Sequence, residues 1–85
     1  MLQNQDKNND LYFTSDFGCC VALVSRGFKV TDLNREVKKV KFGFERSQEL
    51  LDAVDSYRRF ELQVDARVYF EASKMVKGLI YGDEL

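Results

Sequence analysis

The chain has 85 residues, an apolar share of 45% and a formal net charge of −1. A chain of this length builds one domain around one small core. It has no histidine, proline or tryptophan, and its only cysteines are the neighbours Cys19 and Cys20. Neighbouring cysteines cannot join distant segments, which excludes a disulfide framework. We interpret the pair as two small core residues rather than a redox pair.

No stretch of the sequence approaches the roughly 18 unbroken apolar residues of a membrane span, and the N-terminal residues do not resemble a signal peptide. We therefore expect a cytoplasmic protein that does not use a membrane. Residues 1–10 are predicted to be a disordered polar tail, residues 11–82 a single α+β domain and residues 83–85 an acidic C-terminal end.

The first predicted elements are a short strand and a buried helix. Residues 11–14 are rich in β-favouring side chains, and Ser15 and Asp16 after them are both good N-caps. The helix predicted over residues 17–26 is apolar nearly all round, which is typical of a buried helix. Gly27 and Phe28 suit its end, with the glycine in left-handed backbone and the phenylalanine folding back onto the helix.

Residues 28–33 and 39–45 alternate between apolar and polar side chains and predict an antiparallel hairpin. The alternation directs Val40, Phe42 and Phe44 toward the core. The exposed face of the sheet is then expected to carry Lys29, Thr31, Lys39 and Lys41.

Two further helices complete a β-α-β-β-α-α order. Ser47 is predicted to cap a helix over residues 48–59, and Asp65 a helix over residues 66–81. Residues 60–64 between them predict an extended linker or a minor strand. The last helix is expected to pack through one stripe, formed by Val68, Ala72, Met75, Val76, Leu79 and Ile80. The predicted fold is α+β, a small antiparallel sheet with helices packed on one face.

The sequence contains no recognisable catalytic arrangement. Without histidine there is no imidazole base or ligand, and two adjacent cysteines cannot form a tetrahedral zinc site. The five glycines are scattered singly, so no phosphate-binding loop is expected. Carboxylate pairs at helical spacing, Asp52 with Asp55 and Glu49 with Asp52, are interpreted as solvated charge. We expect a protein that is not an enzyme and uses no cofactor or metal.

Charge is distributed unevenly along the chain. Residues 26–46 carry seven basic and three acidic side chains, although the whole chain is slightly acidic. This pattern predicts a basic interaction face that could contact nucleic-acid phosphates or an acidic protein surface. The alternative is a solvated face whose charges discourage edge-to-edge aggregation. The candidate residues of the basic face are Lys29, Arg35, Lys38, Lys39 and Lys41.

The sequence from Lys41 to Phe44 (KFGF) resembles part of the aromatic strand motif of RNA-recognition domains, and residues 11–13 resemble their first-strand motif. In that family the strand aromatics point away from the helices and stack on bases. Here that orientation would turn Lys39, Lys41 and Glu45 into the core, at a large desolvation cost. A helix also takes the place of the fourth strand. We therefore predict that Phe42 and Phe44 are core residues and that this resemblance is superficial.

A second resemblance runs from Thr14 to the end of the last helix, mainly through capping and core positions. It is carried by Thr14, Ser15, Asp16, Leu23, Gly27, Phe28, Lys29, Phe42, Gly43, Phe44, Glu45, Ser47, Leu50, Tyr57, Leu62, Val64, Asp65, Phe70, Lys74 and Leu79. These residues resemble a family of short uncharacterised bacterial and phage proteins known only as a domain of unknown function. The resemblance implies the same fold layout and a bacterial or phage origin, and it implies no activity.

From these observations we expect a non-catalytic protein-interaction module that binds a protein partner or a second copy of itself. The apolar helix over residues 17–26 is the expected self-association surface if the sheet covers only one of its sides. The alternative is a nucleic-acid-binding accessory protein that uses the basic hairpin face. That alternative predicts salt-sensitive binding, weakened by Lys39→Glu or Lys41→Glu.

Overall fold

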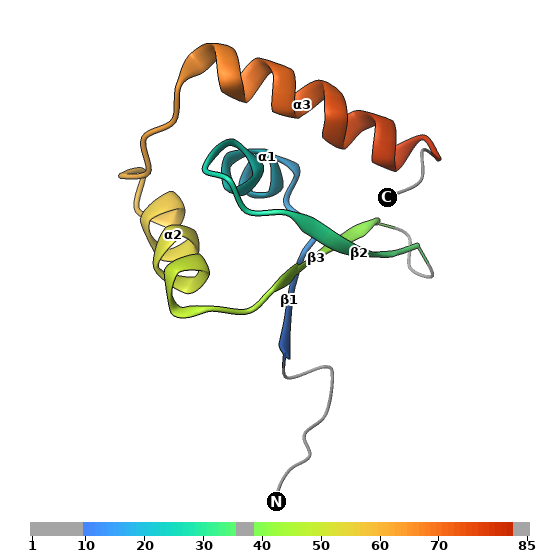
Figure 1. The fold of residues 1–85 in the computed structure, drawn as a ribbon, viewed down its shortest axis with the longest axis horizontal. Coiled ribbons are helices and arrows are strands. Elements are labelled where there is room, and N and C mark those ends of the chain that lie inside the picture. Colours follow the sequence, from blue (N-terminus) through green and yellow to red (C-terminus); the bar gives the residue numbers. More distant parts are fainter. Residues whose placement is uncertain (1–9, 36–38, 83–85) are drawn as a thin grey trace, which may run out of the picture.

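The computed structural model describes residues 10–35 and 39–82, and Figure 1 shows their arrangement. Most of the predicted tail (residues 1–10), Lys38 and the acidic end (residues 83–85) lie outside the described residues. The elements follow the predicted β-α-β-β-α-α order. They are β1 (Leu11–Thr14), α1 (Phe17–Ser25), β2 (Val30–Asn34), β3 (Lys41–Glu45), α2 (Gln48–Arg58) and α3 (Ala66–Ile80). No described helix is long and apolar enough to span a bilayer.

The three strands form an antiparallel sheet in the order β1-β3-β2, which confirms the α+β fold. Both β1 and β2 pair with β3, so they run parallel to each other with β3 between them. In Figure 1, α1 lies between the sheet and α3, and α2 lies beside α1. The core therefore lies around α1, where one sheet face and two other helices meet.

The side-chain direction of the central strand agrees with the prediction. Phe42 and Phe44 are 2% and 0% exposed and belong to the core cluster. Gly43 between them faces the other way, and the ring of Phe13 lies over it. A Cβ atom at Gly43 would lie 2.7 Å from Cε1 of Phe13. The motif that resembles RNA-recognition domains is thus built into the core on its aromatic side.

Two of the four residues expected on the exposed sheet face lie outside the strands. Strands β2 and β3 are shorter than predicted, so Lys29 and Lys39 lie before the strands and not within them. The register also skips Thr31, because Val30 pairs with Phe44 and Asp32 pairs with Gly43. Such a bulge shifts the alternation of side chains by one residue. By this register the open face of the sheet carries Leu11, Phe13, Asp32, Lys41 and Glu45.

Helix α1 is buried on more sides than one. Residues 19–23 are all buried, because α3 covers the side of α1 that the sheet leaves open. Self-association through α1 was expected only if one of its sides stayed open. Because α3 covers that side, α1 does not offer such a surface. The ends of the helix agree with the prediction. Asp16 accepts a hydrogen bond from the backbone N–H of Cys19 (3.0 Å), and the N–H of Phe28 donates to the carbonyl of Leu23 (3.1 Å).

The N-caps of α2 and α3 are Ser47 and Asp65, as predicted. In α3, however, the predicted stripe is too wide: Ala72, Val76 and Leu79 are buried, but Val68 and Met75 are about half exposed. Helix α3 has 15 residues and α1, the main element beneath it, has nine. Because each residue adds about 1.5 Å to a helix, the shorter helix cannot cover the longer one along its full length.

Candidate functional site

The two cysteines are free thiols and both are buried. Burial raises the pKa of the Cys20 thiol to about 12, and burial together with the charge of Asp16 raises the pKa of Cys19. A protonated thiol is neither a nucleophile nor a metal ligand. Within residues 10–35 and 39–82, no three or more His, Cys, Asp or Glu side chains are grouped so that they could hold a metal ion.

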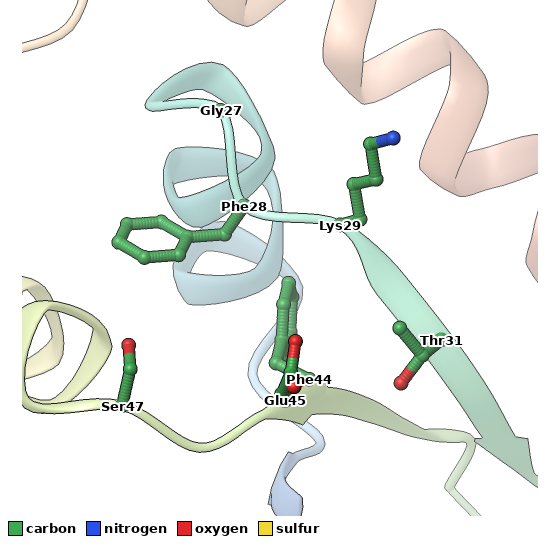
Figure 2. Close-up of a pocket in the computed structure, with 7 residues that line it drawn as sticks. All are labelled: Gly27, Phe28, Lys29, Thr31, Phe44, Glu45 and Ser47. Atoms are coloured by element: carbon green, nitrogen blue, oxygen red, sulfur yellow. The ribbon is translucent and has the colours of Figure 1, made fainter.

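The residues proposed for a basic hairpin face do not come together. Lys41 lies on the open face of the sheet, and Lys39 lies in the exposed segment before β3. Arg35 donates a hydrogen bond to the carbonyl of Leu79, near the C-terminal end of α3. Figure 2 shows the Lys29 side chain leaving the segment before β2 on the side where α3 passes. The hairpin cations are thus divided between the open sheet face and the α3 side of the domain.

The pocket in Figure 2 lies between the end of α1, the start of β2 and the start of α2. It is a shallow cavity of about 290 Å³, lined by Phe28 and Phe44 together with Lys29, Glu45 and polar groups. No polar or charged residue among those described is buried in the domain. A specific small-molecule site usually places a few polar groups in an enclosed apolar cavity. This pocket therefore lacks the features of an enclosed binding site.

The most unusual residue is Phe60, which follows the C-terminal end of α2. The N–H of Phe60 donates to the carbonyl of Tyr57 (3.0 Å), and the N–H of Glu61 donates to the carbonyl of Ser56 (2.9 Å). These two bonds form the Schellman motif, which requires left-handed backbone at the residue after the cap. Phe60 accordingly has φ +62°, and among the described residues it is the one non-glycine residue with positive φ.

The other two helices end with glycine at the same position. Gly27 after α1 has φ +99°, and Gly82 after α3 has φ +111°. A residue with a Cβ atom loses roughly 1–2 kcal/mol in left-handed backbone, whereas glycine does not. The ring of Phe60 does not offset this cost, because the residue is 96% exposed. The fold itself therefore gains nothing from a phenylalanine at this position.

The charges beside Phe60 are balanced. Arg59 forms salt bridges with Asp55 and with Glu61, the latter at 3.1 Å. No unpaired cation is thus held next to the ring by these residues. Phe60 thus exposes an apolar ring on a turn whose backbone is fixed by two hydrogen bonds.

A second exposed surface runs along α3, on the side opposite its buried stripe. Its members recur three or four residues apart, which places them on one helix face. They are Arg67, Phe70, Lys74, Lys77 and Tyr81. Phe70 is 59% and Tyr81 83% exposed, and the Lys74 ammonium lies 5.0 Å from the centre of the Phe70 ring. We call these five residues the basic-aromatic stripe.

Comparison with family models gives one match, to a domain of unknown function (DUF5659), over residues 9–82. The chain belongs to the DUF5659 family. The match covers all six elements and confirms the family resemblance seen in the sequence. Neither the curated proteins nor the solved structures contain a match to the chain. Family membership therefore supports the fold unit and assigns no activity.

Both exposed surfaces of this DUF5659 domain went unrecognised in the sequence. Phe60 begins an alternating segment, which predicts extended backbone and hides the left-handed turn. The basic-aromatic stripe could have been found, because its spacing is visible once residues 66–81 are taken as a helix. The spacing of the apolar residues in that helix identifies only its buried stripe, and Phe70 and Tyr81 lie on the opposite face.

Proposed function

We propose that this DUF5659 domain is a non-catalytic protein-interaction module that docks onto a partner protein through Phe60. The observation that carries the proposal is a fully exposed aromatic ring, held in backbone where a side chain lowers stability. A side chain that weakens the fold and packs against almost nothing within the chain is explained when its contacts are made with another molecule. The proposal keeps the expected cytoplasmic location and the expected absence of an enzymatic activity.

A protein fits Phe60 better than a nucleic acid does. Because Arg59 is paired with both Asp55 and Glu61, the ring is not accompanied by free positive charge for a phosphate. Aromatic side chains are common among the few residues that dominate protein interfaces. Burying a phenylalanine fully in an apolar pocket contributes about 1.5–3 kcal/mol. The two backbone hydrogen bonds that fix Phe60 also reduce the ordering cost on binding.

The test compares the wild-type chain with Phe60→Gly and Phe60→Ala as immobilised baits in nuclease-treated extract of the native host. We expect at least one protein to be retained by the wild type and lost by both variants. Phe60→Gly relieves the backbone strain, so its loss of binding cannot be attributed to unfolding. An identical set of retained proteins for all three baits would contradict the proposal.

Self-association is the form of this proposal in which the partner is a second copy of the chain. It is measured by sedimentation of the purified protein over a wide concentration range. If the partner is a second copy, the wild type dimerises and Phe60→Gly stays monomeric. If both remain monomeric, the partner is a different protein.

A further inference from the structure

The outward face of α3 combines positive charge with exposed aromatic rings. Arg67, Lys74 and Lys77 contribute three cations to the basic-aromatic stripe. Helix α3 contains one acidic residue, Glu71, whose Oε1 lies 3.3 Å from Nζ of Lys74. The stripe therefore has a positive balance, which complements a polyanion.

One cation from the hairpin, Arg35, lies close to the end of this helix. The guanidinium of Arg35 is hydrogen-bonded to the carbonyl of Leu79, so its charge is fixed near the C-terminal end of α3. Leu79 belongs to the buried stripe of α3, so Arg35 is not counted with the basic-aromatic stripe. Among the cations of the predicted hairpin, Arg35 is thus joined to α3 by a hydrogen bond.

The open face of the sheet has the opposite character. A shallow pocket on it is lined by Asp10, Asp32 and Glu45 together with Leu11 and Thr31. Lys41 is the cation that the described strands contribute to this face. Phosphates are repelled by such a group of carboxylates, so a nucleic acid is not expected on the sheet, where RNA-recognition domains bind it.

The aromatic rings of the stripe decide between kinds of polyanion. Phe70 and Tyr81 lie 11 residues apart, which corresponds to about 16 Å along a helix. Lys74 and Lys77 lie between them. Exposed rings separated by basic side chains match a single strand, whose bases stack on the rings while its phosphates contact the cations. Paired bases in a duplex do not present their faces in this way.

We propose that the basic-aromatic stripe of α3 binds single-stranded nucleic acid. In this arrangement Phe70 and Tyr81 each stack on one base, Lys74 and Lys77 contact the phosphates between these bases, and Arg67 contacts a phosphate beyond Phe70. The surface differs from Phe60 and goes beyond the protein-docking function proposed above. The domain then has one contact for a protein and another for a nucleic acid.

Fluorescence anisotropy of the full chain with labelled 20-nucleotide oligothymidylate and oligouridylate, over a series of salt concentrations, tests this directly. Three phosphate contacts predict a slope of about −2 for log K against log salt. Lys74→Gln combined with Lys77→Gln should reduce the magnitude of this slope by about 1.4. Phe70→Ala and Tyr81→Ala should each weaken binding roughly tenfold and leave the slope unchanged.

Matched substitutions away from the stripe serve as controls. Met75→Ala removes a half-exposed apolar side chain from the flank of the same helix, and Lys41→Gln removes a lysine from the open sheet face. Neither should change the affinity, and Phe60→Gly should not change it either. Thermal unfolding of each variant checks that the domain stays folded, which is expected because the substituted side chains are exposed.

Four results would overturn the proposal. The first is no binding to either oligonucleotide at 20 mM salt, and the second is equal or tighter binding to a duplex. The third is loss of binding in Lys41→Gln or Lys39→Gln without loss in the α3 variants, which would assign binding to the hairpin. The fourth is binding to anionic phosphatidylglycerol vesicles without binding to the oligonucleotides, which would identify a lipid surface as the partner of α3.

Discussion

Replacing Phe60 by glycine should make the domain more stable. The native φ of +62° costs a residue with a Cβ atom roughly 1–2 kcal/mol, and glycine removes this cost. Glycine also gives the unfolded chain more freedom, which offsets roughly 0.5–1 kcal/mol of the gain. Because the residue is 96% exposed, almost no buried contact is lost. The expected net stabilisation is about 1 kcal/mol, which raises the Tm of so small a domain by about 4–8 °C.

Urea denaturation followed by circular dichroism measures this change. The midpoint should rise for Phe60→Gly while the slope m stays constant, since the surface exposed on unfolding is nearly the same. Phe60→Ala keeps the left-handed strain and removes the ring, so its midpoint should stay close to that of the wild type. If Phe60→Gly were as stable as the wild type or less stable, the ring would be packed in solution and the reasoning about Phe60 would be refuted.

Three further predictions concern the core and the turns. Gly27→Ala should destabilise the domain by about 1 kcal/mol in the same denaturation assay, because its φ of +99° disfavours any Cβ atom although the space around it is open; an unchanged midpoint would contradict this. Gly43→Ala should lower the free energy of unfolding by about 1–3 kcal/mol, because the new methyl group would meet the ring of Phe13 at 2.7 Å and the Cβ of Asp32 at 2.9 Å. Part of that loss should be recovered in a double variant with Phe13→Ala. Simple additivity of the two substitutions would show that the ring is not the obstacle. The pKa of Cys20 is about 12 in the folded state against 9.0 for an ordinary thiol, so the folded state keeps a proton that the unfolded state releases. Stability should therefore be unaffected by this group below pH 9 and should fall as pH rises from 9 toward 12, and the fall should be smaller in Cys20→Ala; equal slopes for the two proteins would contradict the burial of this thiol.

Local sequence signals account for most of the elements and their ends. Asp16, Ser47 and Asp65 cap the helices they precede, because a short polar side chain can accept a bond from the first turn. The end of α1 was predictable since Gly27 followed by Phe28 satisfies both parts of the Schellman motif. The inward direction of Phe42 and Phe44 followed from the desolvation cost of the charged residues on either side of them, Lys39, Lys41 and Glu45. Each of these inferences uses residues that are neighbours in the chain.

The features that were not predicted depend on contacts between distant segments. The bulge at Thr31 arises from the pairing of β2 with β3, and the alternation within residues 28–33 does not reveal it. The half exposure of Val68 and Met75 depends on how far α1 extends under α3. Phe60 was missed for a different reason. Its type favours extended backbone, and the hydrogen bonds at the end of α2 impose the opposite conformation.

The central proposal is that the exposed ring of Phe60 contacts a partner protein. Crosslinking from this position tests the proposal most directly. A photoreactive benzoylphenylalanine in place of Phe60, activated by light in native host cells, reports which molecules lie within reach of the ring. The same residue in place of Gln48, an exposed position at the start of α2, is the control. We predict a discrete crosslinked protein from position 60 that is absent from position 48. No adduct at position 60, or the same adducts from both positions, would contradict the proposal.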